Sequence, residues 1–294
     1  MKLVAFASLA LLAAVLVSPA RVEAKVDDQV EDAVPDDGGE PENTTTGFQY
    51  EFKFPEDTRP ASLFGIDVSH HQGDIDWSKV SGQSVVFAYV KATQGSSHLD
   101  VRFASHWESL EREGSIFRGA YHFMSAAADP YEQAQNFLNA TRGTYAGDLP
   151  PCLDLEWDYR TRGSRYDRWA RLSSEEIVRR ALIWLQTVEA STGKRPIIYT
   201  NSRWWKNRIK DSKELAGYRL WIADYADESL RAEQPWVPDG FEWVFWQISD
   251  RGELSTGGVD GRVDANYYRG TEADFLREFG LSGAAHEASM RPPS

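Results

Sequence analysis

Cysteine is nearly absent from this 294-residue chain, in which Cys152 is the only example. A single cysteine excludes an internal disulfide, so burial of apolar surface must hold the fold together. The roughly 230 residues beyond the N-terminal region are enough for one barrel-sized domain with its own core. Cys152 lies in an apolar run and has no His/Asp partner pattern, so we expect a buried small hydrophobe rather than a nucleophile.

Long apolar runs are absent after the N-terminal segment. There, Lys2 precedes the apolar residues 3–17, and small residues offer cleavage sites after Ala20 or Ala24. This order is typical of a secretory signal peptide, and the run is shorter than the ~20 residues of a membrane-spanning helix. An uncleaved anchor is the alternative. We expect residues 1–24 to be removed, leaving a secreted or periplasmic protein outside the membrane.

Positive charge is sparse, since 32 Lys and Arg residues face 45 Asp and Glu residues, for a formal net charge of -13. No basic block could contact phosphates, which argues against nucleic acid as a partner. Residues 25–57 hold eleven acidic residues and two lysines, with few large aliphatic residues, so this stretch cannot offset its ordering entropy. We therefore predict a disordered acidic linker at 25–60, a folded domain at 61–280 and a disordered tail at 281–294.

Histidine is also scarce, with six residues in the chain. His70 and His71 are adjacent, but no third ligand stands at a recognisable spacing from them. Loop hydrogen bonding is therefore favoured over a zinc site. We expect no metal and no cofactor.

Short β-branched and aromatic runs alternate with helical patterns, which is typical of a β/α repeat with a largely parallel sheet. The predicted strands are 63–68, 85–91, 119–123, 152–156, 196–200, 220–223, 243–247 and a weaker one at 262–265. The predicted helices are 101–113, 130–142, 173–192 and 272–279. Ser173 and Glu176 are expected to form a capping box at the third of these helices, and Gly193 to end it. About eight strands with fewer than eight helices predict an α/β fold, an irregular (β/α) barrel similar to a TIM barrel.

Acidic residues follow several predicted strands, at the barrel end where active sites lie. Asp154 and Glu156 are two residues apart on one strand, so both side chains should face the cavity while Leu153 and Leu155 pack outward. Asp67 and Asp264 end the first and last strands. Neighbouring carboxylates raise a pKa and keep one acid protonated, as glycosidic cleavage requires. Solvated charges or a metal ligand set are the alternatives, and Asp224 is expected only to cap a loop.

Aromatic residues are plentiful, with 11 tryptophans, and several lie near strand ends where rings can stack on sugars. Each ring is also a candidate for the core. His122 could bind substrate or be a satisfied core histidine. The residues proposed to contact substrate are Tyr121, His122, Trp157, Tyr199, Tyr225, Trp246 and Gln247.

Several ordered motifs resemble glycoside hydrolase family 25, the cellosyl-type lysozymes. The first is Gly65-Ile66-Asp67-Val68-Ser69-His70-His71-Gln72-Gly73, with Ile75-Asp76-Trp77 just after it. In order there follow Phe87 to Gly95, Gly119 to Phe123, Leu153 to Glu156, Ile198 to Asn201, Leu220 to Ala223, Trp246-Gln247 and Val263 to Asn266. The resemblance spans roughly residues 63–279.

The resemblance implies an irregular barrel and N-acetylmuramidase activity on the β-1,4 bond from N-acetylmuramic acid to N-acetylglucosamine in peptidoglycan strands. Glu156 then resembles the general acid, and Asp154, Asp67 and Asp264 the accompanying carboxylates. The chain departs from the family in a long insertion at 158–171, expected to form one groove wall. The acidic linker also stands where many relatives carry wall-binding repeats. A monomer is expected, and a catalytically inactive glycan-binding barrel or a glycosidase on chitin-like glycans are the alternatives.

Overall fold

The computed structural model describes residues 52–53, 63–142, 149–159, 164 and 166–281. The predicted signal peptide, most of the predicted linker and nearly all of the predicted tail lie outside these residues. Within the described part of the chain, no helix combines the length and the apolar character that crossing a membrane requires.

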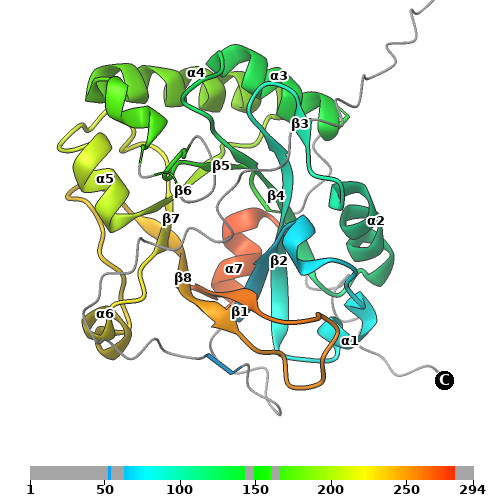
Figure 1. Cartoon of the computed structure of the whole chain (residues 1–294). Helices are drawn as coiled ribbons and strands as arrows, with labels where there is room; N and C mark the ends of the chain where they lie inside the picture. Colours follow the sequence, from blue (N-terminus) through cyan, green and yellow to red (C-terminus); the bar gives the residue numbers. More distant parts are fainter. Residues whose placement is uncertain (1–51, 54–62, 143–148, 160–163, 165, 282–294) are drawn as a thin grey trace, which may run out of the picture. The chain divides into compact units, whose positions relative to one another are not determined.

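Strands and helices alternate along the described residues (Figure 1). The strands are β1 (Leu63–Val68), β2 (Val85–Gln94), β3 (His98–Leu99), β4 (Phe117–Phe123), β5 (Cys152–Asp154), β6 (Ile197–Asn201), β7 (Leu220–Ala223), β8 (Trp243–Gly252) and β9 (Val263–Tyr268). The α-helices are α1 (Trp77–Ser81), α2 (Phe103–Glu113), α3 (Pro130–Ala140), α4 (Ser174–Thr192), α5 (Ser202–Arg208), α6 (Asp227–Ala232) and α7 (Glu272–Phe279). The short 3-10 helix η1 (His70–Gln72) follows β1. A second one, η2 (Arg168–Arg171), precedes α4.

Eight of these strands close into a barrel. The order β1-β9-β8-β7-β6-β5-β4-β2 returns to β1 because β1 also pairs with β2. Neighbouring strands are parallel from β1 through β2, β4, β5, β6 and β7 to β8, whereas β9 runs antiparallel to both β8 and β1. The short β3 pairs only with the end of β2. The predicted irregular barrel with fewer than eight α-helices is therefore confirmed over the described residues.

Aromatic rings fill the interior of the barrel, because inward-facing positions of successive strands carry them. The Phe87 and Tyr89 rings of β2 are fully buried. A Cβ atom on Gly65 would lie 2.4 Å from the Phe87 ring, and one on Gly119 would lie 2.3 Å from the Tyr89 ring. Glycine at these two positions therefore makes room for the rings of the adjacent strand.

Helix α7 closes the amino-terminal end of the barrel. Its Phe275 is fully buried, with its ring centroid 5.4 Å from that of Phe117 at the start of β4 and 5.0 Å from that of Tyr268 at the end of β9. Because β9 is antiparallel, its last residue lies beside the first residue of β1, Leu63. The opposite, carboxyl-terminal end is the one left for a site.

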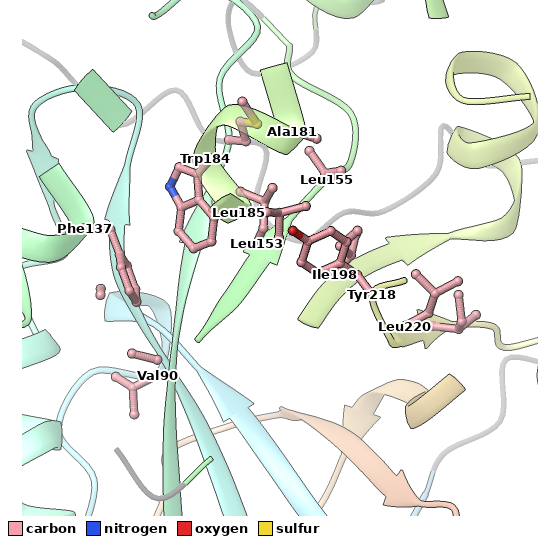
Figure 2. Packing of buried hydrophobic residues seen from close by; sticks show 14 of the residues in the cluster. Val90, Phe137, Leu153, Leu155, Ala181, Trp184, Leu185, Ile198, Tyr218 and Leu220 are labelled. Atoms are coloured by element: carbon pink, nitrogen blue, oxygen red, sulfur yellow. The ribbon is translucent and has the colours of Figure 1, made fainter. Parts of the chain in front are cut away.

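The outer core lies between the barrel and its helices. Figure 2 shows Leu153 and Leu155 beside the α4 residues Ala181, Trp184 and Leu185, so the outward packing predicted for the two leucines is confirmed. Ser173 caps α4 by accepting a bond from the Glu176 amide, and Gly193 ends the helix with a φ of 68°. The predicted capping box is only half formed, because the Glu176 carboxylate binds Arg179 and Arg180 instead.

Three short helices were not predicted, namely α1, α5 and α6. Each is too short to show a full apolar period, which is why the later connections looked like loops. Strand β2 continues to Gln94 and β8 to Gly252, beyond the predicted ends at 91 and 247, while β5 stops at Asp154, before the predicted end at 156.

Two ends of the predicted domain need adjustment. Phe52 falls in the predicted linker, yet it is buried, with its ring centroid 5.1 Å from that of Phe64, and its carbonyl accepts a bond from the Glu253 amide. Leu281 falls in the predicted tail, yet its amide donates to the Leu276 carbonyl at 2.8 Å. At these two points the chain packs onto the barrel, because each residue has an apolar surface within reach.

Candidate active site

Carboxylates from three strands meet at the carboxyl-terminal end of the barrel. Asp67 is the penultimate residue of β1, and Asp154 is the last residue of β5. Asp264 is near the start of β9, which the antiparallel direction brings to the same end, directly opposite Asp67. Asp67 and Asp154 are buried, and Asp264 is half-buried.

Asp67 is held by two side-chain amides. Its Oδ2 accepts a hydrogen bond of 2.8 Å from Asn266 Nδ2 and one of 2.9 Å from Gln247 Nε2. Both donors come from the strands that close the barrel, β9 and β8. Two donors on one carboxylate oxygen fix the orientation of the carboxylate and favour its charged form.

A second layer of hydrogen bonds orients those amides. The Trp221 indole donates to Asn266 Oδ1 at 2.8 Å. The Tyr199 and Tyr225 hydroxyls both donate to Gln247 Oε1, the first at 2.9 Å. Because each amide oxygen is already occupied, each amide nitrogen must point toward Asp67. Five side chains from β6, the β7–α6 loop, β7, β8 and β9 therefore set the direction of one carboxylate.

Asp67 and Asp264 form a carboxyl–carboxylate pair. Burial raises the pKa of Asp67, and the bonds from Asn266, Gln247 and Asp264 oppose that rise. The pKa of Asp264 is held well above its usual value by burial first, and then by the charge of Asp67, to which Asp264 hydrogen-bonds. Like charges this close do not both ionise readily, so the proton stays on Asp264 and Asp67 carries the charge.

Asp154 lies in the least polar part of the site. It is 5% exposed, and its Oδ1 has no hydrogen-bond partner among the described residues. Burial, followed by the negative charge of Glu156, raises the pKa of Asp154 well above its usual value, while the Lys91 charge opposes the rise. The sequence predicts one raised pKa in the Asp154/Glu156 pair and makes Glu156 the neutral acid, whereas burial and the charge of Glu156 raise the pKa of Asp154 instead. A neutral Asp154 can donate a hydrogen bond from inside the site.

Glu156 follows β5 rather than ending it. The strand stops at Asp154, and the chain continues in irregular but buried or half-buried backbone through Tyr159. The Leu155 amide still donates to the Tyr199 carbonyl at 2.9 Å, so the chain stays close to β6 as it leaves the sheet. Glu156 is half-buried and thus more open to solvent than Asp154.

The aromatic candidates divide into two groups. Tyr121, Tyr199 and Trp157 are half-buried, and Tyr225 is 42% exposed. The charges of Asp67 and Asp154 both contribute to raising the pKa of Tyr121 and that of Tyr199, after burial, which locates these hydroxyls near the carboxylates.

Trp246 and His122 are core residues. Trp246 is 3% exposed, and its indole donates to the Asp224 carbonyl at 2.8 Å. His122 is fully buried, stacks on Trp184 of α4, and its Nδ1 lies 2.7 Å from Thr93 Oγ1. Burial lowers the pKa of His122 to about 3, so the ring is neutral. Of the two alternatives predicted for His122, the structure therefore shows the second, a core histidine whose hydrogen bonds are satisfied. Gln247 is also buried and contacts the site through Asp67, Tyr199 and Tyr225.

Asp224 shapes a loop, as expected. Its Oδ2 accepts from Ser229 Oγ at 2.7 Å and from the Trp236 amide at 2.8 Å, and its Oδ1 accepts from the Ala226 amide. These bonds tie together both ends of α6.

The sequence did not single out two residues that lie beside the carboxylates, Lys91 and Asn266. Lys91 is buried in β2 and donates to Gln94 Oε1 at 2.8 Å. A lysine within a run of buried strand residues could have indicated a site residue, because a cation is costly to bury. Asn266 lies two residues after Asp264, hence on the same face of β9, and that spacing could have identified it.

The base of the 158–171 insertion is pinned by two buried aspartates. Asp158 Oδ2 accepts from the Ser125 hydroxyl and the Ala126 amide at 2.8 Å each, and its Oδ1 accepts from Arg168 at 2.9 Å. Asp167 binds Arg208 of α5 at 2.7 Å and also accepts from the Asp158 amide. We call Asp158, Asp167, Arg168 and Arg208 the clasp. It joins the β4–α3 loop, the β5–α4 connection and α5.

A search of the described residues for three or more His, Cys, Asp or Glu side chains arranged to hold a metal ion finds no such group. Asp67 is instead satisfied by two side-chain amides and by Asp264. The arrangement can supply protonated and ionised carboxyl groups side by side, which suits acid-assisted cleavage of a glycosidic bond.

Known proteins provide an independent comparison. The sequence profile of Glycosyl hydrolases family 25 matches residues 66–257. The chain is 39% identical to the YegX protein of Escherichia coli K12 over 72% of each chain, and 32% identical to Lysozyme M1 of Streptomyces globisporus over 81% of this chain and 76% of that one. The structure resembles the bacterial lysozyme from Streptomyces coelicolor with a TM-score of 0.63 and 32% identity, covering 76% of this chain and 97% of that one. The chain therefore belongs to glycosyl hydrolase family 25 and is a glycoside hydrolase.

Proposed function

We propose that this enzyme is a muramidase, which hydrolyses the β-1,4 bond between N-acetylmuramic acid and N-acetylglucosamine in peptidoglycan. The observation that carries the proposal is the cluster of carboxylates at the carboxyl-terminal end of the barrel, in which protonated and ionised acids lie together. The similarity to proteins named lysozymes supports the choice of substrate.

In this mechanism, Glu156 protonates the glycosidic oxygen from its half-buried position beside the groove. Asp154 and Glu156 share one proton, which rests on the buried Asp154 in the free enzyme and passes to Glu156 for delivery to the glycosidic oxygen. The Asp154 carboxylate then holds the 2-acetamido group of the sugar or stabilises the developing positive charge. Asp67 and Asp264 orient substrate and water, with the charge on Asp67 and the proton on Asp264. Tyr121, Tyr199, Tyr225 and Trp157 contact the sugars. No cofactor enters the scheme.

The first prediction tests the acid. Glu156→Gln keeps the size of the side chain but cannot donate the proton, so turnover of purified peptidoglycan should fall by about 10²–10⁴-fold while binding is retained. Release of soluble muropeptides measures turnover, and sedimentation with insoluble peptidoglycan measures binding. Asp224→Asn is the control, because Asp224 serves only its loop, and it should keep near-native activity. Near-native activity of Glu156→Gln would show that another group is the acid.

Mass analysis of the products separates this function from its alternatives. A muramidase leaves N-acetylmuramic acid at the new reducing end. N-acetylglucosamine at that end, or faster cleavage of chitin oligomers, would indicate a different glycosidase. Binding without any product would indicate a glycan-binding barrel.

The same proposal includes export. The N-terminal sequence pattern supports a secreted or periplasmic protein, cut after Ala20 or Ala24, whose acidic linker precedes the catalytic barrel. We expect the exported protein to be a monomer. Sequencing the N-terminus of the exported protein locates the cleavage site, and an intact Met1 on membrane-bound protein would contradict the proposal.

A further inference from the structure

One wall of the site carries cationic side chains beside Trp157 that the mechanism does not use. Trp157 directly follows Glu156, and its ring is approached by two guanidinium groups of α5. The Cζ atom of Arg208 lies 5.4 Å from the ring centroid and that of Arg203 lies 6.0 Å from it. The Tyr159 ring is nearly parallel to that of Trp157, with 15° between the planes and 6.4 Å between the centroids.

The two arginines have different surroundings. Arg208 is held by Asp167 of the clasp, with nitrogen–oxygen distances of 2.7 Å, and is largely covered. Arg203 is exposed in the first turn of α5, directly after the carboxyl end of β6. Arg203 therefore stands at the same end of the barrel as the carboxylates and is the more accessible of the two cations.

The charges of both Arg203 and Glu156 act on the Tyr159 hydroxyl. Its pKa is raised by burial first and by Asp167 next, and it responds to the positive charge of Arg203 and to the negative charge of Glu156 as well. One phenol thus lies within the electrostatic reach of both side chains. Trp157, Tyr159 and Arg203 form a surface beside Glu156, which we call the arginine wall.

The positive charge of the arginine wall can offset the negative charge of the carboxylates. Asp67 and the Asp154/Glu156 pair leave negative charge at this end of the barrel, which would repel an anionic substrate. The substituent of each muramic residue in peptidoglycan carries a carboxylate, on the peptide where one is attached and on the lactyl group where none is. We infer that Arg203, assisted by the Tyr159 hydroxyl, binds a carboxylate on the substituent of the muramic residue bound next to Glu156. This inference rests on the proposed function and specifies its substrate as the anionic, substituted glycan.

The test pairs two variants of α5 with two forms of one substrate. Arg203→Gln removes the charge from the arginine wall. Lys206→Gln is the matched control, because Lys206 is also exposed on α5 and its Nζ lies 4.4 Å from the ring centroid of a different tryptophan, Trp236. The substrates are purified peptidoglycan and the same material after carbodiimide coupling to ammonia, which converts its carboxylates to amides.

On unmodified peptidoglycan, Arg203→Gln should lower kcat/KM about fivefold, which corresponds to the upper end of the free energies of exposed ion pairs. Arg203→Glu should lower kcat/KM further. On amidated peptidoglycan, Arg203→Gln should match the wild type, and Lys206→Gln should match it on both substrates. Strands stripped of peptide expose the lactyl carboxylate, which an attached peptide otherwise caps as an amide. A loss that persists on them shows that Arg203 binds the lactyl carboxylate of unsubstituted residues, and a loss that disappears assigns the ligand to the peptide.

Wild-type rates for Arg203→Gln on unmodified peptidoglycan would overturn the inference. An equal loss on both substrates would overturn it too, because Arg203 would then act only by supporting Trp157. The proposed function is judged separately, since it requires only that the wild type cleave peptidoglycan at muramic acid and that Glu156→Gln does not.

Discussion

At the residue scale, the chemistry of the site depends on which carboxyl group carries a proton. Asp67 receives two amide donors on one oxygen, whereas Asp154 has a buried oxygen with no donor or acceptor among the described residues. The same functional group is thus stabilised as an anion at one position and as a neutral acid at the other. Asp264 resembles Asp154 in its raised pKa, with the charge of Asp67 as an added cause.

The second prediction concerns the free energy of unfolding that is lost because the pKa of Asp264 is raised. The pKa of Asp264 is higher in the folded chain than its usual value near 3.8, so the folded state binds this proton more tightly than the unfolded state does. The stability contributed by the proton is complete below pH ~4 and is lost as the pH rises toward the folded pKa. Asp264→Asn supplies a permanent amide donor to Asp67 and removes this loss.

We therefore expect Asp264→Asn to raise the free energy of unfolding at pH 7 by about 0.5–2 kcal/mol, with a smaller effect at pH 4, while activity falls. Thermal unfolding at both pH values measures the change. A gain of equal size at both pH values, or a loss at pH 7, would contradict the raised pKa.

At the scale of elements, the connection between β5 and α4 determines how Glu156 and Trp157 are presented. Strand β5 is only three residues long, so hydrogen bonds beyond the sheet must hold the chain that follows it. The clasp provides them through Asp158 and Asp167, each accepting from at least one backbone amide and one arginine. The insertion predicted to form a groove wall thus begins from a fixed base.

The third prediction tests the clasp. Asp167→Ala leaves the guanidinium of Arg208 without its buried partner and removes the cap of η2, so it should cost about 3 kcal/mol. It should also lower kcat/KM, because the clasp supports Trp157 beside the acid. Urea unfolding and muropeptide release measure the two effects.

Glu176→Ala is the matched control for Asp167→Ala. Glu176 also pairs with arginines, at 2.7 and 2.8 Å, but on the partly exposed face of α4. Such pairs contribute little, so Glu176→Ala should change both stability and activity much less. Equal losses for the two variants would mean that the clasp has no special role.

At the scale of the whole domain, closure of the barrel is what assembles the site. The bond from Asn266 to Asp67 joins residues 199 apart in the sequence, and the bond from Gln247 joins residues 180 apart. Both depend on the β1–β9 and β8–β9 pairings, which exist only when the sheet closes. The aromatic interior below the carboxylates supports that closure and excludes water from beneath them.

The fourth prediction tests this support. A Cβ atom on Gly119 would meet the Tyr89 ring at 2.3 Å, so Gly119→Ala should displace the ring and cost about 1–3 kcal/mol. Gly82→Ala is the control, because Gly82 has an ordinary φ of -69° and its nearest contact would be 3.5 Å away. Thermal unfolding should show a clear loss for the first variant and little change for the second. Comparable melting temperatures would argue against a tightly filled barrel.

The sequence by itself determined most of the elements and the face that each presents. Apolar alternation identified the eight barrel strands, Ser173 and Gly193 marked the ends of α4, and a spacing of two placed Leu153 and Leu155 outward. These features are local, because burial periodicity and capping involve residues only a few positions apart. Short helices such as α5 were missed since fewer than two turns show no period.

The tertiary structure decided what depends on residues distant in the sequence. It showed that β9 turns back antiparallel and so brings Asp264 opposite Asp67, and that Asn266 and Gln247 orient that pair. It also distinguished residues of the site from residues of the core. His122 and Trp246 look like site residues because they lie near predicted strand ends, but both are buried. Strand order, burial and pKa arise from neighbours that only closure of the barrel brings together. Local sequence patterns therefore identified the carboxylates, and the fold assigned their charges.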